Sequence, residues 1–539
     1  MENLAKPLRS KLAPATLFPL GLAAAALLLR FAFPPWSCPA AGIAGFSLFF
    51  LLLARTRRPL AAGFFFHALF GILLSFYLFT SLTAYFHIGL LRSTVLFLVV
   101  AGVLPSVFFT LCCRAAHGTV QAIARQEGFL PGLGMAAWAA SAFCLAEYGR
   151  ASLSPEQGFG HMACVWWKVA WLRSLAAVAG ETGASFFFFL LALLIFRAAA
   201  LLSGKRSRPA AASLGAAGGL LCLGAALSAV AAPAPGAGRA LAVAVAHPAI
   251  SQSQRWKTEF FRPHLMKYRK MSLDARFPED VTARLIVWPE TALTYFVEQD
   301  PQTLDVIREV TSRQKAFLLM GAPTLAGTED SRATRNSALL FTPEGRPAGS
   351  YDKLHLLPFA EKKIGPWGLP GSGPSGSYEP GRSARPLNME GEGGKSIARP
   401  GVAVCFEVGI FRHMQSLWRH GSDVFVNLSN DAWFGDSSES EQQLALLSLA
   451  CSEYGVPGIR ATGYGAAALV DAGGEVKART GNADKEVLTG VIRVPEKRPR
   501  PLAARFPGWF TLVCAALFVG GLLIRIFRGE STENQTGKK

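Results

Sequence analysis

Charged residues are scarce in this chain, and acidic ones most of all. Only 17% of its 539 residues are Asp, Glu, Lys or Arg, whereas 51% are hydrophobic, and the mean hydropathy is +0.30. This composition is well above that of an ordinary soluble protein and excludes a single water-soluble domain. Part of the chain must therefore lie in lipid.

The chain also lacks a continuous basic stripe, although 54 Lys and Arg residues outnumber 36 Asp and Glu residues and give a formal charge of +18. Nucleic-acid-binding proteins gather basic residues on one face, with aromatic residues between them. Here the basic residues form short clusters beside apolar segments. This pattern excludes a nucleic-acid partner and indicates membrane topology instead.

No disulfide framework and no metal-binding motif is visible. Of the nine cysteines, only Cys405 and Cys451 fall in the long polar region, and the others lie in or near apolar segments. A bridge between these two is possible in an oxidising compartment, but it would consume a candidate nucleophile. The histidines show no spacing typical of metal ligands, so we expect neither a catalytic metal nor a cofactor. The histidines considered are His161, His247, His264, His355, His413 and His420.

Eight apolar segments approach or reach the length of about 20 residues that a helix needs to cross a bilayer. They are residues 12–33, 38–54, 61–79, 93–113, 130–146, 184–202, 213–232 and 509–526. The first is a retained helix, not a cleaved signal peptide, because further apolar segments follow it at once. We expect a polytopic α-helical membrane domain with about eight transmembrane helices.

Lys and Arg residues in short loops favour the cytoplasmic side of a membrane. Basic clusters precede the first apolar segment and follow the second, fourth, sixth and eighth. The clusters are Lys6, Arg9 and Lys11; Arg55, Arg57 and Arg58; Arg114 and Arg125; Lys205, Arg206 and Arg208; and Arg525, Arg528, Lys538 and Lys539. We therefore expect both termini in the cytoplasm and the polar region outside, which in a bacterium is the periplasmic face of the inner membrane.

The expected organisation follows from these segments. Residues 1–232 form a seven-helix transmembrane domain, 239–501 a periplasmic catalytic domain, 505–529 a C-terminal transmembrane helix and 530–539 a cytoplasmic tail. In the polar region, short apolar runs alternate with Gly, Pro and charged turns, which is an α/β pattern. We predict strands at 241–246, 285–288, 316–321, 337–341, 402–405, 424–428, 466–470 and 486–492, and helices at 303–313, 411–419 and 441–453. Residues 365–394, with nine glycines and five prolines, predict an irregular loop.

Three residues at or near predicted strand ends could together form a thiol enzyme's active site. Cys405 ends an apolar run, Glu290 follows another, and Lys353 follows or flanks a third probable strand. A free thiol is mostly protonated at neutral pH, so a carboxylate would serve as general base. A lysine would favour the thiolate and stabilise an oxyanion. Each residue alone has a simpler explanation: a buried small hydrophobe, a turn or cap carboxylate, and a solvated surface cation.

A resemblance across the region brings these residues together. The runs Trp288-Pro289-Glu290, Tyr351-Asp352-Lys353 with Pro358-Phe359-Ala360-Glu361, and Cys405-Phe406-Glu407 resemble, in order, the signature blocks of the nitrilase (carbon–nitrogen hydrolase) superfamily. A further block runs from Asn427 to Gly435, and Arg460-Ala461-Thr462 follows it. With seven apolar segments before and one after, the chain resembles the membrane-embedded branch of that superfamily, the apolipoprotein N-acyltransferases.

This resemblance implies a four-layer α-β-β-α sandwich and an acyl transfer through a thioester on Cys405. Glu290 would be the general base and Lys353 the oxyanion-stabilising cation. The implied supporting residues are Glu361, Glu407, Trp256, in the position of the family's lysine–tryptophan block, and Asn336. The implied partners are a phospholipid acyl donor, diacylglyceryl apolipoproteins as acceptors and the lipid bilayer, and we expect a monomer.

Some positions depart from the family's pattern. Phe406 replaces a common tyrosine, Ala360 a common glycine, and Gly463 the asparagine that commonly follows Arg-Ala-Thr. These changes affect substrate positioning more than chemistry. Two other readings stay open: a membrane-tethered amidase in which water resolves the thioester, and a transporter or receptor with an inactive nitrilase-like domain.

Overall fold

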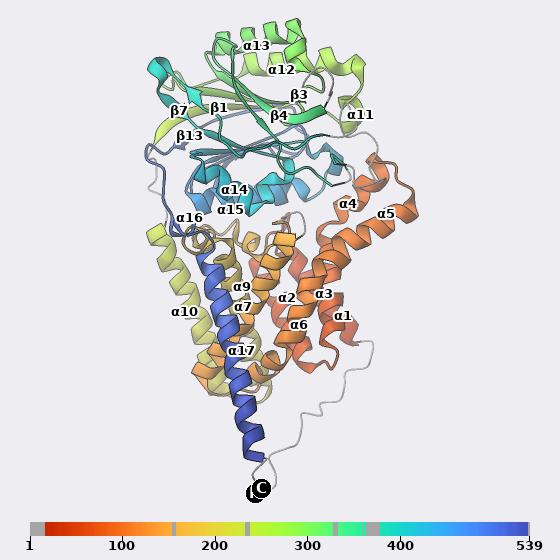
Figure 1. Ribbon diagram of the computed structural model, residues 1–539, viewed down its shortest axis with the longest axis vertical. Coiled ribbons are helices and arrows are strands. Elements are labelled where there is room, and N and C mark those ends of the chain that lie inside the picture. The colour runs from red at the N-terminus through yellow and green to blue at the C-terminus, as the bar shows by residue number, and fades with distance from the viewer. Residues whose placement is uncertain are drawn as a thin grey trace.

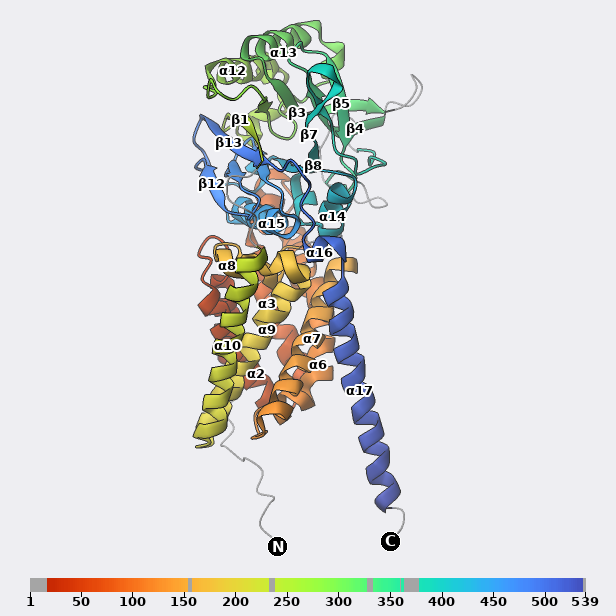
Figure 2. The same ribbon diagram turned by 90° about the vertical axis from the view of Figure 1, so that its left-hand side faces the viewer.

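The computed structural model describes residues 17–153, 158–231, 238–326, 333–358, 360–362 and 378–536. An α/β part stands on a bundle of long helices, and the C-terminal helix runs down the side of that bundle (Figures 1 and 2). Several predicted features lie outside the described residues: Lys6, Arg9, Lys11, Lys538, Lys539, residues 12–16 of the first apolar segment, and residues 365–377 of the predicted loop.

Each predicted apolar segment overlaps a helix or a bent helix pair. These elements are α1 Leu17–Phe31, α2 Pro39–Arg55, α3 Pro59–Leu74 with α4 Phe76–Thr80, α5 Leu90–Phe97 continuing through η2 Leu98–Val103 into α6 Leu104–Ile123, α7 Phe129–Leu153, α9 Leu175–Ser203, α10 Ser207–Ala231 and α17 Trp509–Thr536. Among the described residues, five helices are long and apolar enough to span a membrane, or six if the pair bent by 59° after Leu74 is one span. α1 and α2 are apolar but shorter, and the count of eight spans stays a prediction.

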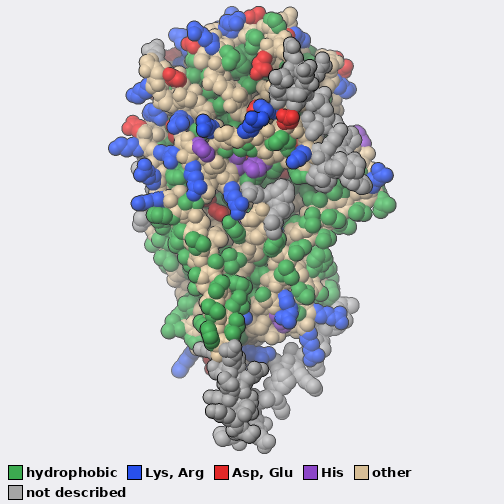
Figure 3. All heavy atoms as spheres, in the orientation of Figure 1, with side chains coloured by type: hydrophobic (Ala, Val, Ile, Leu, Met, Phe, Trp, Pro, Cys, Tyr) green, Lys and Arg blue, Asp and Glu red, His purple; other side chains and the backbone are tan. Residues whose placement is uncertain are grey.

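The outer surface of these helices is apolar. On the face seen in Figure 3, hydrophobic side chains cover much of the lower half of the molecule, with basic side chains at its lower end. Leu512 on α17 is 71% exposed and Leu111 on α6 is 58% exposed. Exposed apolar surface on this scale marks an interaction site, either with another protein or with lipid. Together with the helices of spanning length, it indicates that the helical part belongs in a membrane.

The α/β part contains two stacked sheets within the described chain. One has the order β13-β1-β2-β3-β4-β5 and the other β12-β11-β10-β9-β8. The strands of the first are β1 Arg239–His247, β2 Arg284–Val287, β3 Phe317–Ala326, β4 Ala333–Phe341, β5 Pro347–Asp352 and β13 Glu486–Val494. Those of the second are β8 Pro400–Val404, β9 Val424–Ser429, β10 Gly458–Thr462, β11 Ala468–Val470 and β12 Val476–Arg479.

Helices cover both outer faces of the two sheets. α12 Phe261–Asp274 and α13 Pro301–Gln314 lie above the first sheet, and α14 Phe411–Arg419 and α15 Glu439–Tyr454 lie between the second sheet and the membrane helices (Figure 1). One apolar core fills the space between the sheets, and another lies under α12 and α13. This arrangement confirms the predicted α-β-β-α sandwich.

Every predicted strand overlaps an observed one, but some elements were missed. β5, β10, β12, the short pair β6 Met389–Glu390 and β7 Ser396–Ala398, and helix α12 were not predicted. β5 lies at a sheet edge and is mostly polar, while β10 carries a buried arginine. The predicted strand 466–470 is wrong at its start, because β11 begins at Ala468.

The two parts of the molecule share one apolar core and several polar contacts. The largest core cluster contains both the membrane-helix residue Phe46 and Leu447 of α15. Arg30 Nη2 donates to Ser438 Oγ at 3.0 Å, and Ser81 Oγ donates to the Trp433 carbonyl at 2.7 Å. The Trp433 ring also stacks on Phe86 at 5.1 Å. The bent segment after α3 therefore holds a loop of the α/β part.

Gly71 of α3 provides a test of packing in the helical part. A methyl group there would collide with the backbone carbonyl oxygen of Ala101 in η2. Gly71→Ala should destabilise the fold by about 1–3 kcal/mol through overpacking, lowering the thermal denaturation midpoint in detergent. Gly134→Ala in α7 is the matched control, since nothing lies within 4 Å of that added methyl group. Equal midpoints for the two variants would contradict this packing.

Candidate active site

Cys405 directly follows β8 and begins the short helix η7 Cys405–Gly409, so it lies at the sharp turn between the two. Its φ is 57°, a left-handed conformation that few residues other than glycine adopt. Asn427 of the neighbouring strand β9 donates from Nδ2 to the carbonyl oxygens of Ala403 and Cys405, both at 3.0 Å. Backbone strain of this kind is held in place by surrounding contacts and is common at active sites. Cys405 and Cys451 are both free thiols, so the possible bridge between them is not formed.

Glu290 and Lys353 follow strands of the first sheet and meet beside this turn. The Nζ atom of Lys353 lies 3.5 Å from Oε1 of Glu290 and 2.8 Å from Oε2 of Glu361. Asn336 of β4 donates from Nδ2 to Glu290 at 2.8 Å and to Glu361 at 3.1 Å. Lys353 is only 1% exposed. One ammonium and two carboxylates thus form a buried, hydrogen-bonded cluster.

The charges in this cluster fix the protonation of the site. Burial would lower the pKa of Lys353, but Glu361 and Glu290 together raise that pKa well above its usual range. Burial, reinforced by the Glu290 charge, raises the pKa of the Cys405 thiol. Burial also raises the pKa of Glu290, an effect that Lys353 opposes. The resting site therefore pairs a lysine cation with a protonated thiol, which needs a base before it can react.

Glu407 joins the cysteine turn to the lysine loop. Its Oε2 accepts from the backbone N–H of Val404 at 2.8 Å and from the Tyr351 hydroxyl at 2.9 Å. Its Oε1 accepts from the backbone N–H groups of Leu354 at 2.8 Å and His355 at 2.9 Å. Residues on both sides of the site are thereby fixed to one buried carboxylate.

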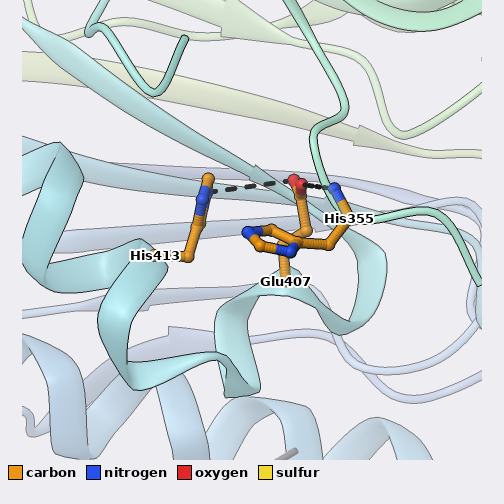
Figure 4. Close-up of side chains that lie close together, drawn as sticks. All are labelled: His355, Glu407 and His413. Atoms are coloured by element: carbon orange, nitrogen blue, oxygen red, sulfur yellow. Dashed lines mark hydrogen bonds and ion pairs between the residues drawn. The ribbon is translucent and has the colours of Figure 1, made fainter. Parts of the chain in front are cut away.

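His355, Glu407 and His413 bring ligand atoms within 4.8 Å of one another, a group that sequence spacing did not indicate (Figure 4). The carboxylate in this group is already engaged by four N–H and O–H donors. Its surroundings are those of a hydrogen-bond acceptor more than of a metal ligand. The expected absence of a metal stays a prediction.

The site opens into a cavity of about 350 Å³ that extends among the membrane helices. Glu290, Lys353 and Cys405 line it together with all the predicted supporting residues except Glu407. Its apolar lining comes mainly from α3, α4 and η1 Ser81–Tyr85 and from α5, η2 and α6, and it includes Phe70, Leu74, Val100 and Leu104. A single cavity thus connects a candidate nucleophile with apolar side chains of the apolar helices.

Two of the departures from the family's pattern also lie at this cavity. The Phe406 ring has the Lys353 Nζ atom 5.3 Å from its centroid, which is a cation–π contact. Ala360 contributes to the lining. The aromatic ring at position 406 therefore keeps an electrostatic contact with the lysine even without a hydroxyl group.

Sequence reasoning missed several residues of the site. Glu439 and Tyr378 line the cavity, and Arg255 lies directly behind Glu290. Glu439 lies two residues before the predicted helix 441–453, and Tyr378 lies in the Gly-rich stretch, and no motif marks either residue. For Arg255 the sequence offered one indication of a role at the site, its position next to Trp256.

Comparison with known proteins gives a family for the α/β part. Residues 243–499 match the carbon-nitrogen hydrolase family. This region is a carbon-nitrogen hydrolase domain. The chain is 31% identical over 269 residues to an apolipoprotein N-acyltransferase of Geobacter metallireducens, covering 49% of this chain and 50% of that protein. It is 30% identical over 286 residues to one of Brucella melitensis, covering 51% and 52%.

The matched segment spans about half the length of these curated relatives. A solved carbon-nitrogen hydrolase from Helicobacter pylori G27 aligns with a TM-score of 0.34 and 16% identity, covering 48% of this chain and 89% of that one.

A substitution at Asn336 tests whether Glu290 acts as the base of this site. Its hydrogen bond to Glu290 favours the charged carboxylate and lowers the pKa of that group. Asn336→Leu should therefore raise the Glu290 pKa. As the pH is lowered, the charged form of Glu290, which acts as the base, would then be lost at a higher pH than in the native protein. The acid limb of the pH–rate profile for Cys405 alkylation by iodoacetamide should move to higher pH.

Ser337→Ala is the matched control for this measurement. Ser337 is the next residue on β4, and its hydroxyl bonds to Asp352 and Thr324 outside the cavity lining. It should leave the acid limb in place. An unmoved limb in folded Asn336→Leu protein would show that Glu290 does not control the thiol.

Proposed function

We propose that this protein is an apolipoprotein N-acyltransferase. It would transfer the sn-1 acyl chain of a phospholipid, through a thioester on Cys405, to the α-amino group of the S-diacylglyceryl-cysteine that begins an apolipoprotein. The observation that carries the proposal is the cavity, because it joins the Cys405 site to apolar side chains of the membrane helices. The relatives with this name support the choice of reaction.

In the first half-reaction, Glu290 takes the proton of the Cys405 thiol. The Sγ atom attacks the sn-1 ester carbonyl carbon, and the negative charge that develops on the carbonyl oxygen is stabilised by the Lys353 ammonium. The ester C–O bond then breaks, and Glu290 returns the proton to the departing lysophospholipid alkoxide. The products are an acyl thioester on Cys405 and a lysophospholipid.

In the second half-reaction, the amino group of the acceptor attacks the thioester carbonyl carbon. Glu290 accepts a proton from the attacking nitrogen, the carbon–sulfur bond breaks and the thiolate regains that proton. Glu361 and Asn336 would hold Lys353 and Glu290 in place, Glu407 would fix the cysteine turn, and Trp256 would contact substrate in the cavity. No other group is needed to balance either step.

Membrane attachment has a catalytic reason in this proposal. Donor and acceptor both partition into the bilayer, since each buried methylene contributes about 0.8 kcal/mol to anchoring. A site fixed at the membrane surface meets both without extracting them, which gains effective concentration and orientation. A water-resolved amidase would need only a small polar pocket.

We further propose a location in the bacterial inner membrane, with the hydrolase domain in the periplasm and both termini in the cytoplasm. Basic residues gather at the end of the helical bundle far from the hydrolase domain (Figure 3), as the positive-inside rule favours. The division into residues 1–232, 239–501, 505–529 and 530–539, and function as a monomer, belong to the same proposal.

Mass spectrometry tests the thioester directly. Purified protein incubated with phospholipid should carry a fatty-acyl mass on the Cys405 peptide that hydroxylamine removes. Cys405→Ala should lose the adduct, and Cys451→Ala, which removes another cysteine of the same domain, should keep it. A folded native protein that never acquires the adduct from a range of phospholipids would refute the proposal and favour a small-amide hydrolase or an inactive domain.

Lys353 should be required for the rate of thioester formation. Removing one oxyanion-stabilising group typically costs about a hundredfold or more in rate, so Lys353→Met should slow adduct formation at least that much. The exposed Lys257→Met variant is the control and should keep the native rate. The thermal denaturation midpoint must be recorded as well, because Lys353→Met removes the buried cation that lies beside the Glu290 and Glu361 carboxylates. A folded variant with the native rate would exclude the assigned role.

A further inference from the structure

Arg255 lies beneath the turn that carries Glu290. It ends the short helix α11 Gln252–Arg255 and is only 2% exposed. Its Nη1 atom donates to the carbonyl oxygens of Glu290 at 3.0 Å and Thr291 at 2.8 Å. Thr291 has a φ of 43°, a left-handed conformation that is unusual for a β-branched residue. The guanidinium group thus holds a strained piece of backbone directly at the candidate base.

The other side of the same guanidinium group lies against Gly463, the first residue after β10. A Cβ atom at position 463 would overlap Nη2 of Arg255. The Gly463 backbone is itself held, because its N–H donates to the Ser429 carbonyl at 3.3 Å and its carbonyl accepts from the Ile250 N–H at 3.1 Å. A side chain at position 463 would therefore displace the guanidinium group more readily than the backbone.

We propose that Arg255 is a positioning residue for Glu290. Gly463, which has no side chain, leaves the space that the Arg255 guanidinium group needs to reach the Glu290 turn. The two residues act as a pair, so a change at one alters the effect of a change at the other. This inference deepens the proposed function, on which it rests.

Arg255 and Gly463 lie 208 positions apart in the chain but next to each other in the fold, since Nη2 of Arg255 occupies the space that a Cβ atom at position 463 would take. A long cation on one side is matched by a residue without a side chain on the other, which keeps the volume between the Glu290 turn and the end of β10 filled.

The contact between Arg255 and Gly463 also affects the lining of the proposed substrate cavity. Trp256, the next residue, lines the cavity, and the Arg255 carbonyl accepts from the Thr294 hydroxyl at 3.3 Å. Displacing the guanidinium group would loosen the Glu290 turn and the start of the segment that carries Trp256. Misalignment of a general base by a fraction of an ångström is enough to slow a reaction strongly.

A double-mutant cycle with Arg255→Lys, Gly463→Asn and the combined variant tests the pair. Two readouts are used: acylation of Cys405 by phospholipid, followed by mass spectrometry, and its acylation by p-nitrophenyl butyrate, followed by p-nitrophenolate release. Contacting residues commonly show coupling that is far from additive. Each single variant should slow acylation about tenfold, and the combined variant should return to within about threefold of the native rate.

Gly473→Ala is the matched control. It adds a methyl group to a turn glycine of the same domain that has no contact with Arg255, and it should keep the native rate. If Gly463→Asn prevents folding, Gly463→Ala alone and with Arg255→Lys repeats the cycle with a smaller side chain. Thermal denaturation midpoints identify the folded variants. A role confined to stability would shift these midpoints without giving a rate rescue.

Two outcomes overturn the pairing: single-variant effects that simply multiply in the combined variant, or folded single variants that acylate at the native rate. Failure of the proposed function looks different. In that case phospholipid leaves no adduct on native Cys405, while the p-nitrophenyl ester still reports whether Arg255 and Gly463 are coupled through Glu290.

Discussion

The ammonium group of Lys353 is almost completely enclosed by protein, and the arrangement of the site follows from balancing its charge. Taking an isolated ion out of water costs several kcal/mol, and only paired charges with further hydrogen bonds offset that cost. Glu361 lies 2.8 Å from this group and Glu290 3.5 Å. Asn336 then donates to both carboxylates. The cation thus holds Glu290, the candidate base, in place, and Glu290 lines the same cavity as the Cys405 thiol.

A second constraint comes from the membrane. The layer formed by α14 and α15 packs on the membrane helices through one continuous apolar core. The bend after Leu74 turns the chain toward the hydrolase domain, and Trp433 rests on the turned segment. Because of this junction, one cavity is lined both by the polar side chains of the candidate site and by apolar side chains of the membrane helices. The same contacts that join the two parts also shape the proposed lipid-binding space.

Much of this architecture could be predicted from local patterns. Long apolar runs marked the helices, and short apolar runs bounded by Gly and Pro marked most strands, because burial on both faces leaves a continuous apolar signal. β5 and β12 were not predicted, because an edge strand with alternating or polar residues gives only a weak strand pattern in the sequence. β10 was not predicted because an arginine such as Arg460 usually indicates a surface position. In the structure Arg460 is fully buried and paired with Asp431.

The sequence by itself determined that part of the chain is apolar enough to lie in lipid, that the polar region has an α/β pattern, and, through short blocks that resemble a known family, which glutamate, lysine and cysteine to examine. Each of these follows from composition, from periodicity or from short blocks of neighbouring residues. Only the tertiary structure decided that Arg255 lies under Glu290 with Gly463 behind it, that Glu439 and Tyr378 line the cavity, and that the cavity reaches the membrane helices. Those facts depend on contacts between residues far apart in the chain, and no local pattern encodes the distance between them.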